Sequence, residues 1–187
     1  MGKELTPRTV LITGGSRGIG AAAAWLCAQQ GWAVAVNYAN DAKAAHGVVE
    51  RIRSAGGTAL ALQADVADEA QVLAMFETLD RELPPLGALV NNAGVVDLPS
   101  RVDAMSLQRL QRMFAINVFG TFICSREAVK RMSTRHGGAG GGISASMAAN
   151  IASTCASSAT SACSAIAVPP SARIFATMPC AAAASLV

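Results

Sequence analysis

The amino-acid sequence predicts an α/β protein built on a doubly wound parallel sheet. Short β-branched runs alternate with Ala- and Leu-rich segments, and helical crossovers of about a dozen residues or more make the strands they join parallel. The predicted strands are apolar at successive positions, as strands covered by helices on both faces are. With 187 residues, of which 52% are hydrophobic, the chain is long enough for one domain with a core.

The local sequence marks each element in turn. Strands are expected where a β-branched or apolar run stops at a turn-forming residue, and these runs are residues 8–13, 33–38, 58–63 and 88–91. Helices are expected where helix formers continue between a capping residue and a glycine or proline stop. These segments are residues 18–30, 41–54 and 68–81, and residues 106–135 as two helices or one helix bent near Gly120.

The composition changes after His136. Residues 137–187 are rich in Ala and Ser and carry one charged residue, Arg173. Alanine buries little apolar surface, so this segment is poor material for a core. We therefore expect a folded domain over residues 1–136 and a truncated or irregular low-complexity tail over residues 137–187, in which residues 141–147 look like a damaged strand. A shifted reading frame of GC-rich DNA produces such a tail, and the alternative is a genuine low-complexity extension.

A glycine-rich turn joins the first predicted strand to the first predicted helix. It reads Thr-Gly-Gly-Ser-Arg-Gly-Ile-Gly over residues 13–20. Glycines let the chain turn tightly and let backbone N–H groups approach a pyrophosphate, which the N-terminus of the helix then stabilises. The strand–turn–helix context favours a dinucleotide site over a plain tight turn, and the lack of a following Gly-Lys-Ser/Thr excludes a P-loop.

The turn and three further motifs resemble the classical short-chain dehydrogenase/reductase family. Asp65-Val66 follows the third strand, Asn91-Asn92-Ala93-Gly94 follows the fourth, and Asn117 lies in the next helix. The resemblance covers about residues 9–133. It implies a Rossmann-like, three-layer α/β/α dinucleotide-binding domain and an NAD(P)-dependent oxidoreductase acting on a small-molecule carbonyl or alcohol. It also implies a homo-oligomer, although the family's usual interface region is not recognisable in this sequence.

The resemblance also implies the cofactor-binding residues. Asp65 and Val66 would flank the adenine, while Asn92, Ala93 and Gly94 would line the ribose and hold the central strand. The full set expected to bind the cofactor is Gly14, Ser16, Arg17, Gly18, Ile19, Gly20, Asn37, Asp65, Val66, Asn92, Ala93 and Gly94.

Charge at the end of the second strand favours NADP over NAD. An NAD site places a carboxylate there, which accepts a hydrogen bond from the ribose 2′-OH. The residue expected at that position is the neutral Asn37, which does not repel a 2′-phosphate, and Arg17 supplies a cation that can pair with one. Asp41 keeps NAD open, although it is better explained as a helix cap.

The family's proton-transfer pair is missing from this sequence. The chemistry uses a tyrosine four residues before a lysine, whose charge lowers the pKa of the tyrosine. The one tyrosine is Tyr38, with Ala at position 42, and the last lysine is Lys130. Asn117 and Ser146 remain as candidate catalytic residues, with Ser144 as the alternative serine. The alternatives to a working reductase are therefore an inactive NADP-binding remnant and a frame-shifted product that does not fold stably.

Other classes of protein fit the sequence poorly. Five cysteines, an odd number without a Cys-x-x-Cys pair, argue against a disulfide framework and a zinc site and suggest the cytoplasm. A net charge of +3 does not call for a nucleic-acid partner. The sequence has no uninterrupted apolar run of the ~18 residues that a membrane-spanning helix needs. We expect no metal site.

Overall fold

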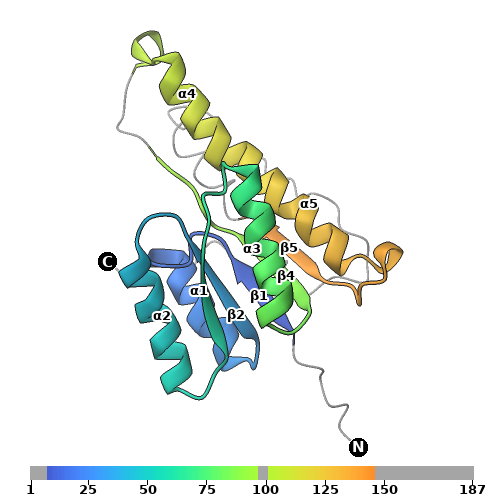
Figure 1. Ribbon diagram of the computed structural model, residues 1–187. Helices are drawn as coiled ribbons and strands as arrows, with labels where there is room; N and C mark the ends of the chain where they lie inside the picture. Colours follow the sequence, from blue (N-terminus) through green and yellow to red (C-terminus); the bar gives the residue numbers. More distant parts are fainter. Residues whose placement is uncertain (1–7, 97–100, 146–187) are drawn as a thin grey trace, which may run out of the picture.

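Within residues 8–96 and 101–145, which the computed structural model describes, five parallel strands form one sheet (Figure 1). They are β1 (Thr9–Ile12), β2 (Ala33–Tyr38), β3 (Ala59–Gln63), β4 (Leu86–Asn91) and β5 (Gly142–Ala145). Their order across the sheet is β3-β2-β1-β4-β5. The predicted doubly wound, Rossmann-like arrangement is confirmed, with β1 at its centre.

Five α-helices and one π-helix carry the chain between the strands in the described part. They are α1 (Gly18–Gln29), α2 (Ala42–Ser54), α3 (Glu69–Glu82), α4 (Leu107–Phe114), a π-helix (Ala115–Phe119) and α5 (Gly120–Met132). Short 3₁₀ turns occupy Val102–Ala104 and Thr134–His136. The Asp41 side chain accepts a hydrogen bond from the Ala44 N–H, which confirms its expected role as a helix cap.

The core lies in two layers, one on each face of the sheet. On one face Val10 and Ile12 of β1 pack with residues of α1 and α2. On the other, Leu11 packs with residues of α3 and α5. All three side chains are fully buried or nearly so. Successive residues of the central strand therefore face opposite helix layers, which is why the strand sequence is apolar without alternation.

The interruption expected near Gly120 takes the form of a π-helix. Residues 107–132 are helical throughout, but the five residues Ala115–Phe119 adopt the wider π geometry between α4 and α5. In π geometry a backbone N–H bonds to the carbonyl oxygen five residues earlier instead of four. The Thr121 hydroxyl also donates a hydrogen bond to the Asn117 carbonyl oxygen. Local π-helical turns inside longer helices are frequent at functional sites.

The sheet continues past residue 136. After α5 the chain turns back, and the N–H groups of Gly138 and Gly140 donate to the carbonyl oxygens of Ser133 and Met132. β5 then pairs with β4, so that Ser144 lies opposite Val90. The expected strand over residues 141–147 is thus present as Gly142–Ala145. Ser146 and the remainder of the predicted tail lie outside the described residues.

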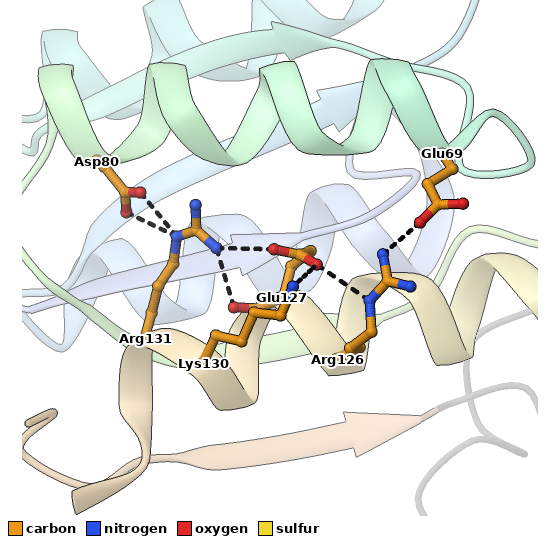
Figure 2. A network of polar contacts seen from close by, with 6 residues as sticks. All are labelled: Glu69, Asp80, Arg126, Glu127, Lys130 and Arg131. Carbon is orange, nitrogen blue, oxygen red and sulfur yellow. Dashed lines mark hydrogen bonds and ion pairs between the residues drawn. The ribbon is translucent and has the colours of Figure 1, made fainter. Parts of the chain in front are cut away.

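A buried carboxylate joins the two helices that cover one face of the sheet (Figure 2). Glu127 of α5 is 3% exposed, and its carboxylate accepts hydrogen bonds from Arg126, Lys130 and Arg131 at 2.8 to 3.2 Å. Arg126 and Arg131 reach across to Glu69 and Asp80 of α3. Burial raises the pKa of Glu127, but the three hydrogen bonds outweigh it and hold the pKa below its ordinary value. The network therefore fixes α5 against α3.

Two further properties concern the described part of the chain alone. None of its helices is both long enough and apolar enough to cross a lipid bilayer. Its His, Cys, Asp and Glu side chains nowhere gather in groups of three that a metal ion could share.

Candidate functional site

The neighbouring strands β1 and β4 have their carboxyl ends at the same end of the sheet, and most of the expected binding residues gather there. The chain leaves β1 through the glycine turn toward β2, and later crosses to the other side of β1 to form β4. The strand order therefore reverses between β1 and β4. In open α/β sheets, ligands bind in the crevice at such a reversal.

Thr13 and Asn92 connect the two segments that border this crevice. The Thr13 hydroxyl oxygen accepts hydrogen bonds from the N–H groups of Asn92 and Ala93, each at 3.0 Å. The Asn92 amide nitrogen donates to the carbonyl oxygens of Thr13 and Gly14, also at 3.0 Å. These four bonds hold the glycine turn and the segment after β4 in one fixed relation.

The first and last motif glycines are required by space. Gly14 has a φ of 62°, and a Cβ there would lie 2.9 Å from the Cα of Ala93. A Cβ on Gly20 would lie 2.5 Å from both the Gly14 carbonyl oxygen and the Asn92 amide nitrogen. Any side chain at either position would force the turn away from Asn92. The two glycines therefore allow the contact that closes the base of the crevice.

The start of α1 is open to solvent beside that base. Arg17 is the N-cap residue in extended conformation and its side chain makes no capping bond, while the first turn of α1 has no acidic residue. Arg17, Gly18 and Ile19 are exposed, and Ser16 is half-buried. Free N–H groups and a positive helix end favour an anion at this place.

Asn37 is buried, and its amide bonds to the protein backbone. Its Oδ1 accepts from the Gly14 N–H at 3.2 Å, and its Nδ2 donates to the carbonyl oxygens of Leu62 and Ala64 at 3.3 and 3.0 Å. The side chain is 1% exposed. Asn37 therefore ties the glycine turn to the end of β3 from within, and both amide hydrogens are used in doing so.

Asp65 and Val66 form the turn that follows β3. Asp65 is half-buried, and its carboxylate accepts from the Ala67 N–H at 2.9 Å. Val66 is 5% exposed and belongs to the core cluster between α3 and α5. The structure brings this turn toward the glycine turn through Asn37, which bonds to both Gly14 and Ala64.

Asn117 lies in the π-helix and bonds to the segment after β4. Its amide makes two hydrogen bonds with the backbone of Val95, the residue after Gly94. Gly94 is exposed. Asn117 therefore fixes the outer end of the Asn92–Gly94 segment, just as Thr13 fixes its inner end. Of the two candidate serines, Ser144 is exposed on β5 and Ser146 lies outside the described residues.

Sequence reasoning gave neither Thr13 nor Gly120 a role in the site. Thr13 makes three of the hydrogen bonds described above, and its signal was a polar residue directly after the apolar run Val10–Ile12. Gly120, expected only as a bend in the helix, touches the Asp65–Val66 turn. No local signal marks that contact, because Val66 lies in a segment distant in sequence.

Comparison with known proteins adds independent findings. A family model described as short chain dehydrogenase matches residues 8–164. The uncharacterized oxidoreductase YgfF of Escherichia coli is 52% identical over 133 residues, which make up 71% of this chain and 54% of that protein.

Two solved structures are also similar. A Serratia marcescens short-chain dehydrogenase/reductase (the F98L/F202L mutant) superposes with a TM-score of 0.66 at 39% identity, covering 70% of this chain and 53% of the other. A short chain dehydrogenase from Burkholderia cenocepacia in complex with NADP gives a TM-score of 0.65 at 35% identity, covering 69% and 52%. The chain thus spans about half the length of the relatives it matches.

Proposed function

Because this chain belongs to the short-chain dehydrogenase family, we propose that it binds NADP(H) at the crevice between the carboxyl ends of β1 and β4. The observation that carries the proposal is the fixed joint between the glycine turn and Asn92, which leaves the start of α1 open beside it. The pyrophosphate would lie against the N–H groups of Gly18 and Ile19.

The preference for NADP over NAD rests on charge. Arg17 is an exposed guanidinium at the N-cap of α1, placed where a nucleotide phosphate would approach. Asn37 places no negative charge near the end of β2 that would repel a 2′-phosphate, and its amide is bonded to the backbone. The similar protein from Burkholderia cenocepacia is in complex with NADP, which supports the same choice.

The family reaction that we propose for this lineage is hydride transfer between NADP(H) and a carbonyl or alcohol. The bound nicotinamide supplies the hydride chemistry. Asn117 would hold the wall of the crevice through Val95, and Ser146 would bond to the substrate oxygen. Reduction of a carbonyl also needs a proton donor of suitable pKa within about 3 Å of that oxygen. An unactivated serine hydroxyl is too weak an acid for this task.

The second candidate function is therefore binding of NADP(H) without turnover. The observation that favours it is the sequence itself, which has one tyrosine, Tyr38, and no tyrosine four residues before a lysine. Tyr38 is buried at the end of β2 and contacts His46. Loss of a general acid typically lowers the rate of such a reaction by about 10² to 10⁴-fold.

One experiment tests both candidates. The full chain is titrated with NADPH and NADH, following energy transfer from its two tryptophans to the dihydronicotinamide, and is then incubated with NADPH and a panel of ketones and aldehydes. We expect tighter binding of NADPH and no oxidation of it above background. Absence of binding would overturn the proposed function. Steady substrate-dependent oxidation would overturn the second candidate and show that the chain holds another proton donor.

We also propose that the chain self-associates through α4, the π-helix and α5. Large apolar side chains are exposed along this continuous helical run, namely Leu107, Leu110, Phe114, Phe119, Phe122 and Val129. An apolar helical face of this length on a protein surface favours contact with another protein. A second copy of the chain is the partner that the family's usual oligomeric state favours.

A further inference from the structure

Gly120, the first residue of α5, lies against Val66. A Cβ built on Gly120 would stand 2.8 Å from the Val66 Cγ2 and 2.9 Å from the Val66 carbonyl oxygen. The backbone of Gly120 is ordinary right-handed helix, with φ −57° and ψ −42°. Its conformation therefore admits any residue, and alanine would favour the helix by about 1 kcal/mol. Only the nearness of Val66 requires glycine here.

Val66 has no free space on its other side. It is 5% exposed and shares a core cluster with Cys124 and Ala128 of α5 and with Val72 and Met75 of α3. A side chain at position 120 would push against the Val66 backbone as well as its methyl group. The Asp65–Val66 turn is therefore held between α5 and α3, and Gly120 sets its distance from α5.

Gln71 of α3 holds the same turn at the neighbouring residue, Asp65. Its Oε1 accepts a hydrogen bond from the Asp65 N–H at 3.0 Å, and its Nε2 donates to Asp68 at 2.8 Å. The Asp68 N–H in turn donates to the Asp65 carbonyl oxygen at 3.0 Å. Gln71 thereby fixes the backbone of Asp65, while Gly120 fixes that of Val66.

We infer that Gly120 and Gln71 are positioning residues for the adenine end of the dinucleotide, because together they set where Asp65 and Val66 stand. Neither side chain needs to touch the nucleotide. The inference rests on the proposed function and on the placement that the family resemblance implies, in which Asp65 and Val66 flank the adenine. It predicts that a change at either residue weakens recognition of the adenine end alone and leaves the nicotinamide end unaffected, because the contacts described for both residues are with the turn at Asp65–Asp68.

The test measures the two ends of the cofactor separately. Gly120→Ala and Gln71→Ala are compared with the wild-type chain for the binding of NADPH, adenosine 2′,5′-bisphosphate and reduced nicotinamide mononucleotide by calorimetry. We expect Gly120→Ala to weaken both adenine-bearing ligands by about tenfold, which corresponds to about 1.4 kcal/mol. Gln71→Ala should weaken both by a smaller factor. The affinity for reduced nicotinamide mononucleotide should stay the same.

Matched controls separate this effect from a general loss of structure. Gly47 lies in α2 with open space around it, and Gln29 is exposed on α1. Gly47→Ala and Gln29→Ala should leave all three affinities unchanged. Hydrogen exchange of residues 64–68 should quicken in Gly120→Ala and Gln71→Ala and in neither control.

Two results would overturn the inference. Equal losses for both ends of the cofactor, or unchanged affinity for the adenine-bearing ligands in a folded variant, would overturn the inference and leave the proposed function standing. Should Gly120→Ala not fold, Gln71→Ala, whose side chain is exposed, decides alone. A wild-type chain that binds none of the three ligands would overturn the proposed function and the inference with it.

Discussion

Asn117 and Val95 form a reciprocal pair of hydrogen bonds. The Asn117 Oδ1 accepts from the Val95 N–H at 2.8 Å, and its Nδ2 donates to the Val95 carbonyl oxygen at 2.9 Å. The side chain thus satisfies both backbone polar groups of one residue, as a neighbouring strand would. Because Asn117 is 7% exposed, water cannot readily replace either bond. The Asn117 amide therefore joins the π-helix to the segment after β4.

Replacing Asn117 with Asp should destabilise the fold. The carboxylate still accepts from the Val95 N–H, but it cannot donate to the Val95 carbonyl oxygen and repels it. We expect the free energy of unfolding at neutral pH to fall by about 2–4 kcal/mol, measured by urea denaturation. Gln29→Glu, at an exposed position of α1, makes the same change of charge as a control. Equal denaturation midpoints for Asn117→Asp and Gln29→Glu would contradict the prediction.

Replacing Asn37 with Asp should also destabilise the protein, rather than simply change its cofactor. The Asn37 Nδ2 donates to two carbonyl oxygens in a site that is 1% exposed. An aspartate would face both of them with an acceptor, at an expected cost of about 3–5 kcal/mol. Thermal denaturation followed by circular dichroism measures this loss. An Asn37→Asp protein as stable as the wild type, with its preference moved toward NADH, would refute the internal role assigned to this amide.

Arg17 offers a cleaner test of cofactor choice because its side chain is exposed. Arg17→Ala should weaken NADPH binding by about 10- to 100-fold, the usual worth of a hydrogen bond to a charged group. Binding of NADH, which lacks the 2′-phosphate, should stay within about twofold. Fluorescence titration at one fixed salt concentration measures both. Arg81→Ala, at the far end of α3, is the charge-matched control, and an equal loss for the two nucleotides would rule out a contact with the 2′-phosphate.

The Glu127 network should make stability depend on pH. The pKa of Glu127 is lowered in the folded state. Its contribution to the free energy of unfolding is therefore present above the ordinary pKa of 4.5 and is lost as the pH falls through the lower pKa of the folded state. Glu127→Gln should lower the free energy of unfolding at pH ~7 by about 1–3 kcal/mol, less than a fully buried pair because Arg126 and Lys130 are half exposed.

The difference between the wild type and Glu127→Gln should shrink as the pH is lowered from about 5 to about 3. Urea denaturation across that range measures it. Glu77→Gln, on the exposed side of α3, should stay within about 0.5 kcal/mol of the wild type at neutral pH. A Glu127→Gln deficit that persists at the lowest pH would show that packing, and not charge, links α5 to α3.

The exposed face of α4 and α5 predicts a change of assembly on substitution. Phe122 is 65% exposed near the middle of this face. Phe122→Glu should shift the chain toward the monomer in sedimentation velocity, because a buried, unpaired carboxylate at an interface is costly. Leu73→Glu, on an exposed position of α3, is the matched control. Identical sedimentation of the wild type and Phe122→Glu would exclude this face as the contact.

The strands and the glycine turn could be predicted from sequence because their signals are local. β2 begins and ends at the predicted residues, Ala33 and Tyr38, since a β-branched run there is bounded by a tryptophan after glycine and by polar residues. α2 also ends at Ser54 as predicted, because two glycines follow closely. Each of these boundaries depends on fewer than ten neighbouring residues.

The orientation of polar side chains could not be predicted in the same way. β2 is buried on both faces, so alternation does not reveal which way Asn37 points. The partners of Asn37 lie 23 to 27 residues away, and those of Thr13 nearly 80. The partner of Asn117 is Val95, 22 residues earlier. Contacts between residues so far apart in the sequence form only when the strands are in place, so the local sequence does not predict them.

The strand order also sets the sequence of events in which the crevice arises. Thr9 pairs with Ala33 on one side and with Leu86 on the other. A chain emerging from a ribosome therefore completes β1, α1 and β2 while the other edge of β1 is still bare. The glycine turn exists at that stage, but Asn92 has not yet arrived to lock it. The seam that would hold the nucleotide closes only when β4 joins β1, after β2 and β3 have been made and before β5 is added. A dinucleotide present during synthesis would therefore stabilise the step that adds β4 to the sheet.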